Sequence, residues 1–591
     1  MSSRENQAIV IRRLTPPGVA TSLQAAISRN LAITLVLVCY ALTPMLVPMW
    51  TPVAIGDDWV YVRSVEILLH EGRLHILDLS VVTLLFQVAW GTLFASLFGL
   101  SFGALRLSTF VMVLLGGLAT YGLCRELQIA RAPSALATAA YLFNPLSFVL
   151  AYTFMSDPHF TALLVIATYG YVRGLRTDRP APAHRAVIFG SLVAACAFLV
   201  RQQGALIPVA IVLALLAQRR LTWDRAGLFL ALRVTALPAL AIAGYYLWLG
   251  LVHGIPQEQR AFTGAVLSAG WEQSMLLVGR MTFIEAMYIG LFTLPVALAA
   301  LSVARGLVQG NTPGVWFALF LWAVMLVCGL VHFQQGDPRQ QLMPRMPYIA
   351  QYLGPSGLGP ADLLGGRRWL VSWQALDVLT AACVVGSLIF ILLLARQTRR
   401  PARPDPSRAS AGTVLMVGLG QIAGALPPSF HFRSWIISVD RYLLPLLPLS
   451  LCLGFWALRG LRPSFGASWV VVGLAALISV AGTRDALALQ QATWDLAKQA
   501  VQDGVPITSL DAGAAWDGYS LYDYGLAHGL SQQTPGGPWW TSLFAPATTS
   551  DYVVASTPLD GYQEVSHTEV NSWLGPDPSL LYLLQRATPA P

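Results

Sequence analysis

Apolar stretches long enough to cross a lipid bilayer recur along the chain from residue 31 to about residue 482. A hydrocarbon core of about 30 Å is spanned by a helix of about 20 apolar residues, and most of these stretches have that length. Because a backbone in lipid must satisfy its own hydrogen bonds, each stretch is expected to be helical. The pattern therefore predicts an α-helical polytopic membrane protein.

One of these stretches differs from the others. Residues 80–98 are apolar but include Gln87, Trp90 and Gly91. We predict that this stretch lies in the outer interface or is re-entrant, and does not cross. The remaining stretches predict about 13 transmembrane helices, at about 31–50, 105–124, 133–153, 158–174, 186–200, 204–218, 226–250, 281–303, 312–332, 371–395, 411–428, 441–459 and 466–482.

Arginines between the stretches set the predicted orientation, because cytoplasmic loops of membrane proteins are enriched in Lys and Arg. The N-terminal tail, residues 1–30, is placed in the cytoplasm, and Arg125 and Arg131 fall on that side only if 80–98 does not cross. The odd number of crossings then puts the C-terminus outside. In this arrangement a membrane domain spans 31–482, with outer loops at 51–104, 254–280 and 333–370.

The composition changes near residue 484. Asp485 is a candidate cap for an amphipathic helix from Ala486 to Val501. Short strand candidates follow among Gly, Pro and Asp-rich turns, at 507–510, 552–555 and 580–584. Residues 483–591 are therefore predicted to form a small α/β domain on the extracytoplasmic side. Its aromatic residues, Trp539-Trp540 and the Tyr-rich 516–524 stretch, would either stack on sugars or pack in a small core.

The composition supports this picture and excludes other classes of protein. The chain has 591 residues, 55% hydrophobic and only 11% charged, with a mean hydropathy of +0.59, whereas soluble proteins carry about 25% charged residues. Its net charge of +8 comes from Arg residues in short loops, which indicates membrane topology and not a nucleic-acid partner. The six cysteines lie in or at the edges of apolar stretches, which favours neither a disulfide framework nor a metal site.

Acidic residues stand at the predicted outer ends of two helices. Asp57 and Asp58 directly follow the first apolar stretch, and Asp157 occupies a short outer turn before Pro158. Each of these acids would serve as a helix N-cap that also favours the helix dipole. Alternatively, acids that converge at one interface would act as a general base with its partner, or as metal ligands. The sequence leaves both interpretations open.

Two arginines are predicted on the same outer side. Arg201 opens a tight turn between two apolar stretches, where either a phosphate or the lipid headgroups would bind it. Arg441 stands at another outer helix start, after His431-Phe432-Arg433, and Asp440 beside it would serve as a local ion-pair partner. His332 ends a helix just before the 333–370 loop and is a weaker candidate, since a lone His at a membrane interface is more often structural.

Several motifs are absent from the sequence. It contains no nucleotide-binding Walker A loop, no HExxH and no GxSxG in a strand-turn-helix context. No His or Cys cluster has the spacing of a zinc site. The apolar stretches show no acid or base at their centres, where an ion pathway would need one, and we find no internal repeat. Chemistry at the outer face is therefore favoured over transport.

The order of these motifs resembles that of the GT-C glycosyltransferases, above all the protein O-mannosyltransferase and aminoarabinose transferase types. The resemblance rests on the acidic pair Asp57-Asp58, the second outer acid Asp157, and an element with Phe-Gly and Leu-Arg at 97–108. It covers about residues 30–205, and Arg441-Tyr442 with the following prolines resembles a late element of these families. Asp58 departs from the family, which usually has Glu at that place, so the catalytic member of the pair stays open.

The resemblance implies a fold and a reaction. A GT-C-like membrane domain with interfacial helices in its first outer loop would transfer a sugar from a polyprenyl-phosphate donor at the extracytoplasmic face, in the inner membrane of a bacterium. Asp57, Asp58 and Asp157 would form the catalytic group, with Asp57 as base or acceptor activator. The remaining site residues are Arg201 and Arg441 for the donor phosphate, and His159, His332 and Tyr442 as substrate contacts.

The resemblance requires no cofactor and no metal, although a divalent cation is compatible with it. The acceptor, which would be a lipid, a glycan or a protein, is not indicated. Two alternatives belong to other classes of protein. One is a lipid-linked glycan transporter or flippase without transferase activity, and the other is a membrane scaffold that presents residues 484–591 to a partner.

Overall fold

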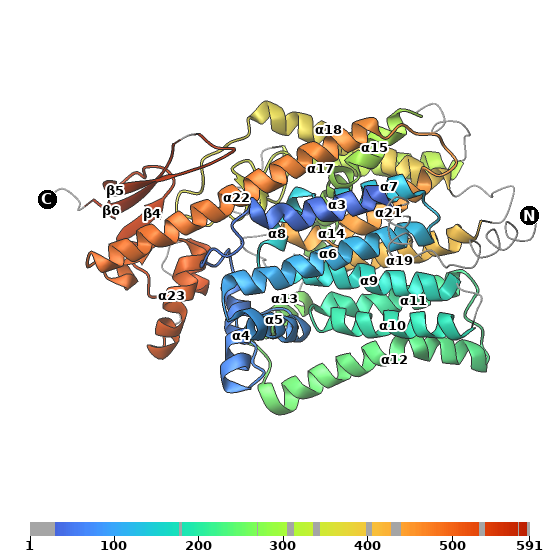
Figure 1. The fold of residues 1–591 in the computed structure, drawn as a ribbon, viewed down its shortest axis with the longest axis horizontal. Helices are drawn as coiled ribbons and strands as arrows, with labels where there is room; N and C mark the ends of the chain where they lie inside the picture. The colour runs from blue at the N-terminus through green and yellow to red at the C-terminus, as the bar shows by residue number, and fades with distance from the viewer. Residues whose placement is uncertain are drawn as a thin grey trace, which may run out of the picture.

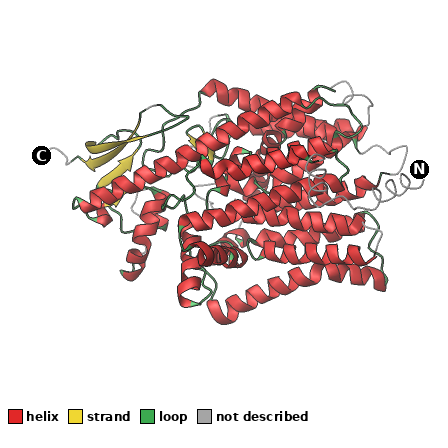
Figure 2. Cartoon of the chain, viewed as in Figure 1, coloured by secondary structure: helices red, strands yellow, loops and turns green. Residues whose placement is uncertain are grey.

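The computed structural model describes residues 30–176, 180–268, 270–303, 313–334, 343–397, 405–426, 439–530, 538–576 and 578–587. Helices dominate this part of the chain, and a small sheet lies at one end (Figure 2). The long helices run side by side in one bundle, while the sheet and α23 (Ala514–Ala527) extend beyond the end of the bundle (Figure 1). The described residues therefore form a helical bundle and a smaller part that contains the sheet.

The first part of the bundle contains the elements that carry the candidate acids. These elements are α3 (Leu31–Leu42), η1 (Thr43–Met45), α4 (Asp58–Glu71), α5 (Leu85–Phe98), α6 (Phe102–Glu126), α7 (Arg131–Leu142), α8 (Pro145–Ala151) and α9 (Ser156–Arg176). The next elements are α10 (Pro180–Phe198), η2 (Gln202–Ala205), α11 (Leu206–Ala217), α12 (Arg225–Trp248), η3 (Leu249–His253) and α13 (Gln257–Leu267).

The rest of the bundle includes a short two-stranded ribbon, formed by β1 (Leu353–Gly354) and β2 (Gly357–Leu358). Its helices are α14 (Trp271–Phe292), α15 (Leu294–Leu301), α17 (Pro313–Phe333), α18 (Trp373–Arg396), α19 (Pro406–Ala425), η5 (Asp440–Leu443), α21 (Leu446–Ala457) and α22 (Gly466–Gln502). Nearly all of α21 is buried, so this helix forms the centre of the bundle.

Seven helices in the described part are long and apolar enough to cross a membrane. The pair α7 and α8, bent by 59°, makes an eighth candidate span. Shorter apolar helices lie at Leu31–Met45, Leu85–Phe98 and Gln202–Ala217. A polytopic helical membrane fold follows from these spans. The number of about 13 crossings and the orientation of the termini stay predictions.

The stretch that was predicted not to cross forms α5, which has only 14 residues. At 1.5 Å per residue it is about 21 Å long, less than the hydrocarbon core. In Figure 1 the long helices run across the picture, whereas α5 is seen nearly end-on. The axis of α5 is therefore steeply inclined to those of the long helices. Its N-terminus is tied to the end of α10, because Leu84 and Phe86 donate backbone hydrogen bonds to the carbonyls of Val200 and Leu199. This geometry agrees with the predicted interfacial or re-entrant segment.

The sequence prediction for the end of the membrane domain was wrong in one respect. Residues 466–482 and Ala486–Val501 do not form two helices, because α22 runs unbroken for 37 residues. Asp485 does not cap a helix. It lies inside α22 and accepts hydrogen bonds from the backbone amides of Trp573 and Leu574 at 2.8 Å and from the Ser572 hydroxyl at 2.7 Å. Apolar residues continue on the buried side of α22 past the membrane part, so its sequence contains no stop signal.

The C-terminal domain contains a four-stranded sheet of order β3-β4-β6-β5. Its elements are η6 (Ile507–Ser509), β3 (Leu510–Asp511), α23, α24 (Trp539–Leu543), β4 (Tyr552–Ala555), β5 (Tyr562–Val570) and β6 (Ser579–Arg586). β3 and β4 are parallel and the other pairs antiparallel. The strands at 552–555 and 580–584 were predicted. β5 was missed because, as an edge strand with exposed Glu and Gln residues, it carries little apolar signal.

One expectation about the membrane helices was also wrong. Glu285 lies inside α14, within the apolar span Ser274–Phe292. It is only 2% exposed, and neither of its carboxylate oxygens has a hydrogen-bond partner in the described part of the chain. An ionisable residue therefore lies well inside an apolar span, whereas the sequence predicted no acid or base at the centre of such a stretch.

Candidate active site

Asp57, Asp157, Arg201 and Arg441 come from four distant parts of the chain and meet in one cluster, which we call the outer cluster. Asp57 and Arg441 form a two-point ion pair, with Nη1 3.1 Å from Oδ1 and Nη2 3.2 Å from Oδ2. This is the fork geometry in which a guanidinium binds a carboxylate most strongly. The sequence prediction that these groups share one side of the molecule is consistent with this contact.

Asp157 lies between the two arginines of the outer cluster. Its Oδ1 forms an ion pair with Arg201, which also approaches the Ser156 hydroxyl at 3.4 Å. Its Oδ2 lies 3.8 Å from Nε of Arg441. The side chain of Asp157 is only 2% exposed. Two cations therefore face this carboxylate in place of water.

The aromatic ring of Tyr442 completes the cluster. The guanidinium carbon of Arg201 lies 4.7 Å from the ring centroid, and that of Arg441 lies 5.5 Å from it. Tyr352 contacts Arg441 in the same manner at 6.0 Å. These cation–π contacts hold both guanidinium groups in place. Asp57 is the most accessible charged member, since its side chain is 24% exposed and those of Arg441 and Arg201 are 8% and 7%.

Asp57 and Asp58 have different surroundings, although they are neighbours in sequence. Asp57 occupies the N-cap position of α4, as one interpretation of the sequence expected, but its side chain makes no capping hydrogen bond. Asp58 is fully buried and accepts hydrogen bonds from the backbone amides of Ile55 at 2.9 Å and Phe154 at 3.3 Å. Burial raises the pKa of Asp58 to about 6, and Arg106 opposes this shift. Asp58 therefore fixes two loops to each other, while Asp57 faces the arginines.

Arg106 explains how the loop before Asp57 is held. This fully buried residue donates to the carbonyls of Met49 at 3.2 Å and Thr51 at 2.7 Å, and also to that of Val53. Three carbonyls on one guanidinium fix the path of residues 49–53. The Leu-Arg element of the sequence contained Arg106, but the residue types alone gave no reason to connect it with this loop.

Asp440 does not form the local ion pair with Arg441 that the sequence suggested. Its Oδ2 instead accepts hydrogen bonds from the amides of Leu353 at 2.7 Å, Tyr352 at 2.9 Å and Gln351 at 3.4 Å. The carboxylate of Asp440 thus anchors the 343–370 segment beside Arg441. Residues 431–433, which precede this element, lie outside the described residues.

Asp362 is an acid of the site that sequence reasoning missed. Its carboxyl pKa is raised to about 7, first by burial and then by the negative charge of Asp57, while Arg441 opposes the shift. Its backbone carbonyl accepts a hydrogen bond from the amide of Ala514 at 3.1 Å, at the start of α23. A single acid in a Pro/Gly-rich loop carries no spacing signal, so nothing in the sequence linked it to Asp57.

The two histidines lie in different places. His159 is fully buried in α9, where its Nδ1 lies 3.0 Å from the Met155 carbonyl, and its Nε2 has no hydrogen-bond partner among the described residues. His332 lies at the exposed end of α17, with its ring against Phe333. In the described part, no contact joins His332 with the outer cluster, so the structure does not bring it to the site.

The C-terminal domain packs directly on the site through α4. The Trp59 ring lies 5.4 Å from that of Tyr522 and 5.5 Å from that of Phe544, and Arg63 pairs with Asp523 at 3.1 Å. The predicted sugar-stacking aromatics are largely used in this packing and in the core of the domain. Trp540, for example, is buried and donates its indole N–H to Asp517 at 3.1 Å.

No group of three or more His, Cys, Asp or Glu side chains in the described ranges is arranged to hold a metal ion. Asp57 and Asp157 are the carboxylates that a divalent cation would use at the outer cluster, and both face arginines in the structure.

Comparison with protein families gives one match. Residues 88–248 match the family described as dolichyl-phosphate-mannose-protein mannosyltransferase. The match covers about a quarter of the chain and agrees with the mannosyltransferase-type resemblance of the sequence motifs. It runs from within α5 to the end of α12 and so includes Asp157 and Arg201, whereas Asp57 and Arg441 lie outside it. A comparison with curated proteins gives no significant match.

Solved structures of similar proteins show low sequence identity. The protein O-mannosyltransferase Pmt1-Pmt2 complex of S. cerevisiae, bound to the sugar donor, is 13% identical with a TM-score of 0.33; the match covers 40% of this chain and 35% of that one. ArnT from Cupriavidus metallidurans is 16% identical with a TM-score of 0.32, over 83% and 82% of the two chains. The oligosaccharyltransferase AglB from Archaeoglobus fulgidus is 13% identical with a TM-score of 0.39, over 81% and 59%. At these values the likeness assigns no role to any residue.

Proposed function

We propose that this protein transfers a sugar from a polyprenyl-phosphate donor to an acceptor at the extracytoplasmic face of a bacterial inner membrane, an activity of the EC 2.4 class. The observation that carries the proposal is the outer cluster, in which an accessible carboxylate, Asp57, is held by Arg441 beside a second arginine and a buried acid. The family match over residues 88–248 supports the same class of reaction.

In the proposed reaction, Asp57 accepts the proton of the acceptor hydroxyl while the acceptor oxygen attacks the anomeric carbon of the donor. The bond between that carbon and the phosphate oxygen breaks, and polyprenyl phosphate leaves with the electron pair. Because phosphate is already a good leaving group, no strong general acid is needed. Arg441 orients Asp57, and Asp157 holds both arginines in position.

Arg201 and Arg441 would bind the donor phosphate. Each guanidinium carries five N–H donors. Arg441 uses one donor on each of its Nη atoms for Asp57 and another on Nη1 for the Met155 sulfur. The Arg201 hydrogen bonds found in the described part of the chain come from Nη1. Donors therefore remain for phosphate oxygens, and the ring of Tyr442 beside both guanidinium groups provides a flat surface for the sugar. The proposal requires no metal ion, and a chelator should leave the transfer rate unchanged.

The test compares Asp57→Asn with the wild-type protein in a transfer assay with a polyprenyl-phosphate sugar. A positioned general base contributes about 10² to 10⁴-fold to a rate, so the variant should lose that much activity. Asp495→Asn, which changes an exposed acid on α22, is the control and should transfer at the wild-type rate. Unchanged transfer by a folded Asp57→Asn variant would show that Asp57 is not the base.

One structural observation favours the flippase alternative. Glu285 is buried within a candidate membrane span, and its carboxylate has no hydrogen-bond partner among the described residues. Acids inside spans often line substrate or proton paths. If the protein is a transferase, Glu285→Gln should keep transfer within about twofold, since Glu285 makes no contact with the outer cluster in the described part of the chain. Loss of lipid flipping in reconstituted vesicles, with no transfer activity in the wild-type protein, would favour the flippase.

A further inference from the structure

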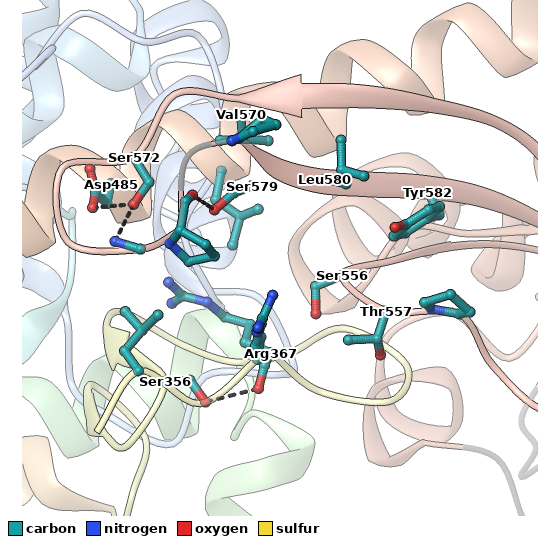
Figure 3. A pocket seen from close by; sticks show the side chains of 17 residues that line it. Ser356, Arg367, Asp485, Ser556, Thr557, Val570, Ser572, Ser579, Leu580 and Tyr582 are labelled. Carbon is teal, nitrogen blue, oxygen red and sulfur yellow. Dashed lines mark hydrogen bonds between the residues drawn. The ribbon is translucent and has the colours of Figure 1, made fainter. Parts of the chain in front are cut away.

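A cavity of about 350 Å³ lies between the C-terminal sheet, α22 and the 343–370 segment, outside the outer cluster. We call it the domain cavity (Figure 3). Its lining is mostly apolar and includes Leu370, Leu489, Val570 and Leu580, besides prolines. Among these apolar groups stand Arg367, Arg368 and several hydroxyl groups. A mostly apolar cavity with convergent polar groups is typical of a binding site for a small molecule.

The charge of the domain cavity is positive. Asp485 is its one acid among the lining residues, and this carboxylate is already neutralised. It pairs with Arg484 at 3.2 Å and accepts hydrogen bonds from the Ser572 hydroxyl and from the amides of Trp573 and Leu574. Asp485 also attracts Arg367. Two arginines and only one acid line the cavity, so its net charge is positive.

Arg367 points into the cavity from the 343–370 segment (Figure 3). One of its N–H groups donates a hydrogen bond to the Leu358 carbonyl at 2.8 Å, which leaves four of its five donors for other partners. Burial lowers its pKa to about 10, so it stays charged at neutral pH. Arg368 is exposed, and no hydrogen bond or ion pair of its side chain is found in the described part of the chain. Both guanidinium groups thus offer donors to negatively charged oxygens.

The serine hydroxyls of the cavity can accept hydrogen bonds, whereas the arginines can only donate them. Ser356, Ser556 and Ser579 donate their O–H groups to the carbonyls of Arg367, Gly366 and Pro576. Their oxygens keep lone pairs that accept hydrogen bonds. A matching ligand must therefore carry hydroxyl groups that donate, together with an anionic group that accepts.

We propose that the domain cavity binds an anionic carbohydrate, with Arg367 and Arg368 holding its phosphate or carboxylate and the serine oxygens accepting from its hydroxyl groups. The apolar lining takes the C–H face of the sugar ring, beside Tyr582. This site is separate from the outer cluster, and binding is measured without a donor. The proposal therefore stands whether or not the protein transfers a sugar.

The test is calorimetric titration of the full-length protein in detergent with three probes: glucose 6-phosphate, glucose and inorganic phosphate. Glucose 6-phosphate should bind at least about tenfold more tightly than either of the other two, because only it satisfies both groups of the cavity. Equal binding of inorganic phosphate would overturn the carbohydrate part of the proposal. Absence of saturable glucose 6-phosphate binding would overturn all of it.

Two matched variants locate the binding site. Arg368→Gln should weaken glucose 6-phosphate binding about tenfold, because it removes a charge-assisted hydrogen bond. Arg586→Gln makes the same change of charge on β6, where Arg586 interacts with Asp551 and does not line the cavity, and it should change affinity less than twofold. An equal effect of both variants, or no effect of either, would place binding elsewhere, for example at the outer cluster, and would overturn the proposal.

A further titration distinguishes a soluble carbohydrate from a lipid headgroup as the ligand of the domain cavity. The same titration is made in nanodiscs with neutral lipid and in nanodiscs with phosphatidylglycerol. Equal affinity in both supports a soluble anionic sugar as the ligand. If the anionic lipid displaces glucose 6-phosphate, the cavity holds a lipid phosphate, and the proposal is wrong.

Discussion

Two pairs of carboxylates lie in different parts of this molecule and are stabilised by different means. Asp57 and Asp157 in the outer cluster are paired with Arg441 and Arg201. Asp511 and Asp517 in the C-terminal domain are fully buried and have only neutral donors: the amides of Ala512 and Gly513, the Trp540 indole and the Ser550 hydroxyl. Charged arginines therefore face the first pair, while neutral donors of the described residues face the second.

This difference separates the candidate active site from a structural element. Burial and the nearby Asp511 carboxylate raise the pKa of Asp517 well above its usual value, so the pair shares a proton and links β3 to α23. In the outer cluster two carboxylates instead face two arginines. Charged groups that are already held in position can stabilise the charge that develops in a reaction.

The largest expected effect comes from breaking the charge balance of the outer cluster. Arg441→Gln would leave Asp57 without its fork partner and Asp157 with one cation. Removing one member of a buried ion pair costs about 3–5 kcal/mol, so the melting temperature in detergent should fall and transfer should be lost. Arg441→Lys keeps the charge but loses the fork, and it should recover stability more than activity. Equal activity in the lysine and wild-type proteins would show that the fork is dispensable.

A smaller effect is expected when the proton-sharing pair is changed. Asp517→Asn keeps the shape and a donor toward Asp511 but loses one acceptor, at a cost of about 1 kcal/mol. In the wild-type domain the folded pKa of Asp517 exceeds the unfolded value. The native state therefore holds a proton that the unfolded state releases, and stability falls as pH rises from about 4 toward the folded pKa.

The asparagine variant lacks this pH dependence. Its melting temperature should therefore lie below that of the wild-type protein at pH 5, and the difference should shrink or reverse by pH 8. Asp523→Asn, at an exposed acid of α23, serves as the control. A difference between Asp517→Asn and the wild-type protein that stays constant over this range would contradict the shared proton.

The smallest expected effect concerns Asp362, which lies between the two regions. Its pKa of about 7 means that it ionises near neutral pH, and its negative charge is then added beside Asp57. Asp362→Asn mimics the protonated form. The variant should therefore match the wild-type rate at pH 6 and be about threefold slower at pH 8, where only the wild-type site carries the extra negative charge. Identical profiles of rate against pH would exclude this coupling.

The sequence indicated which charged residues lie on one side of the molecule, but it did not indicate the contacts that hold them there. Hydrophobic periodicity and arginine distribution placed Asp57, Asp157, Arg201 and Arg441 on one side, because both are properties of local segments. The roles of Asp58, Arg106 and Asp440 could not be predicted in this way. Their partners are backbone amides and carbonyls of distant loops, and a backbone group leaves no signature in the residue types.

The same limit explains the other errors. Asp485 has the residue type of an N-cap, but its partners at 572–574 are more than eighty residues away in sequence. Asp362 lies in a loop without periodicity, and only the fold brings it to Asp57. Glu285 is a single polar residue among apolar neighbours, and a scan for average hydrophobicity passes over it.

The unbroken course of α22 has a consequence for how this chain tolerates change. Each residue of an α-helix adds about 1.5 Å of rise and about 100° of rotation. One residue inserted between Thr483 and Arg484 would turn the whole C-terminal domain, with Asp485, by that angle about the helix axis relative to the bundle, and Asp523 of α23 would no longer face Arg63 of α4. Inserting whole turns would keep the angle but lift α23 away from α4. The length of this helix is therefore as strictly constrained as the identity of any side chain in the site.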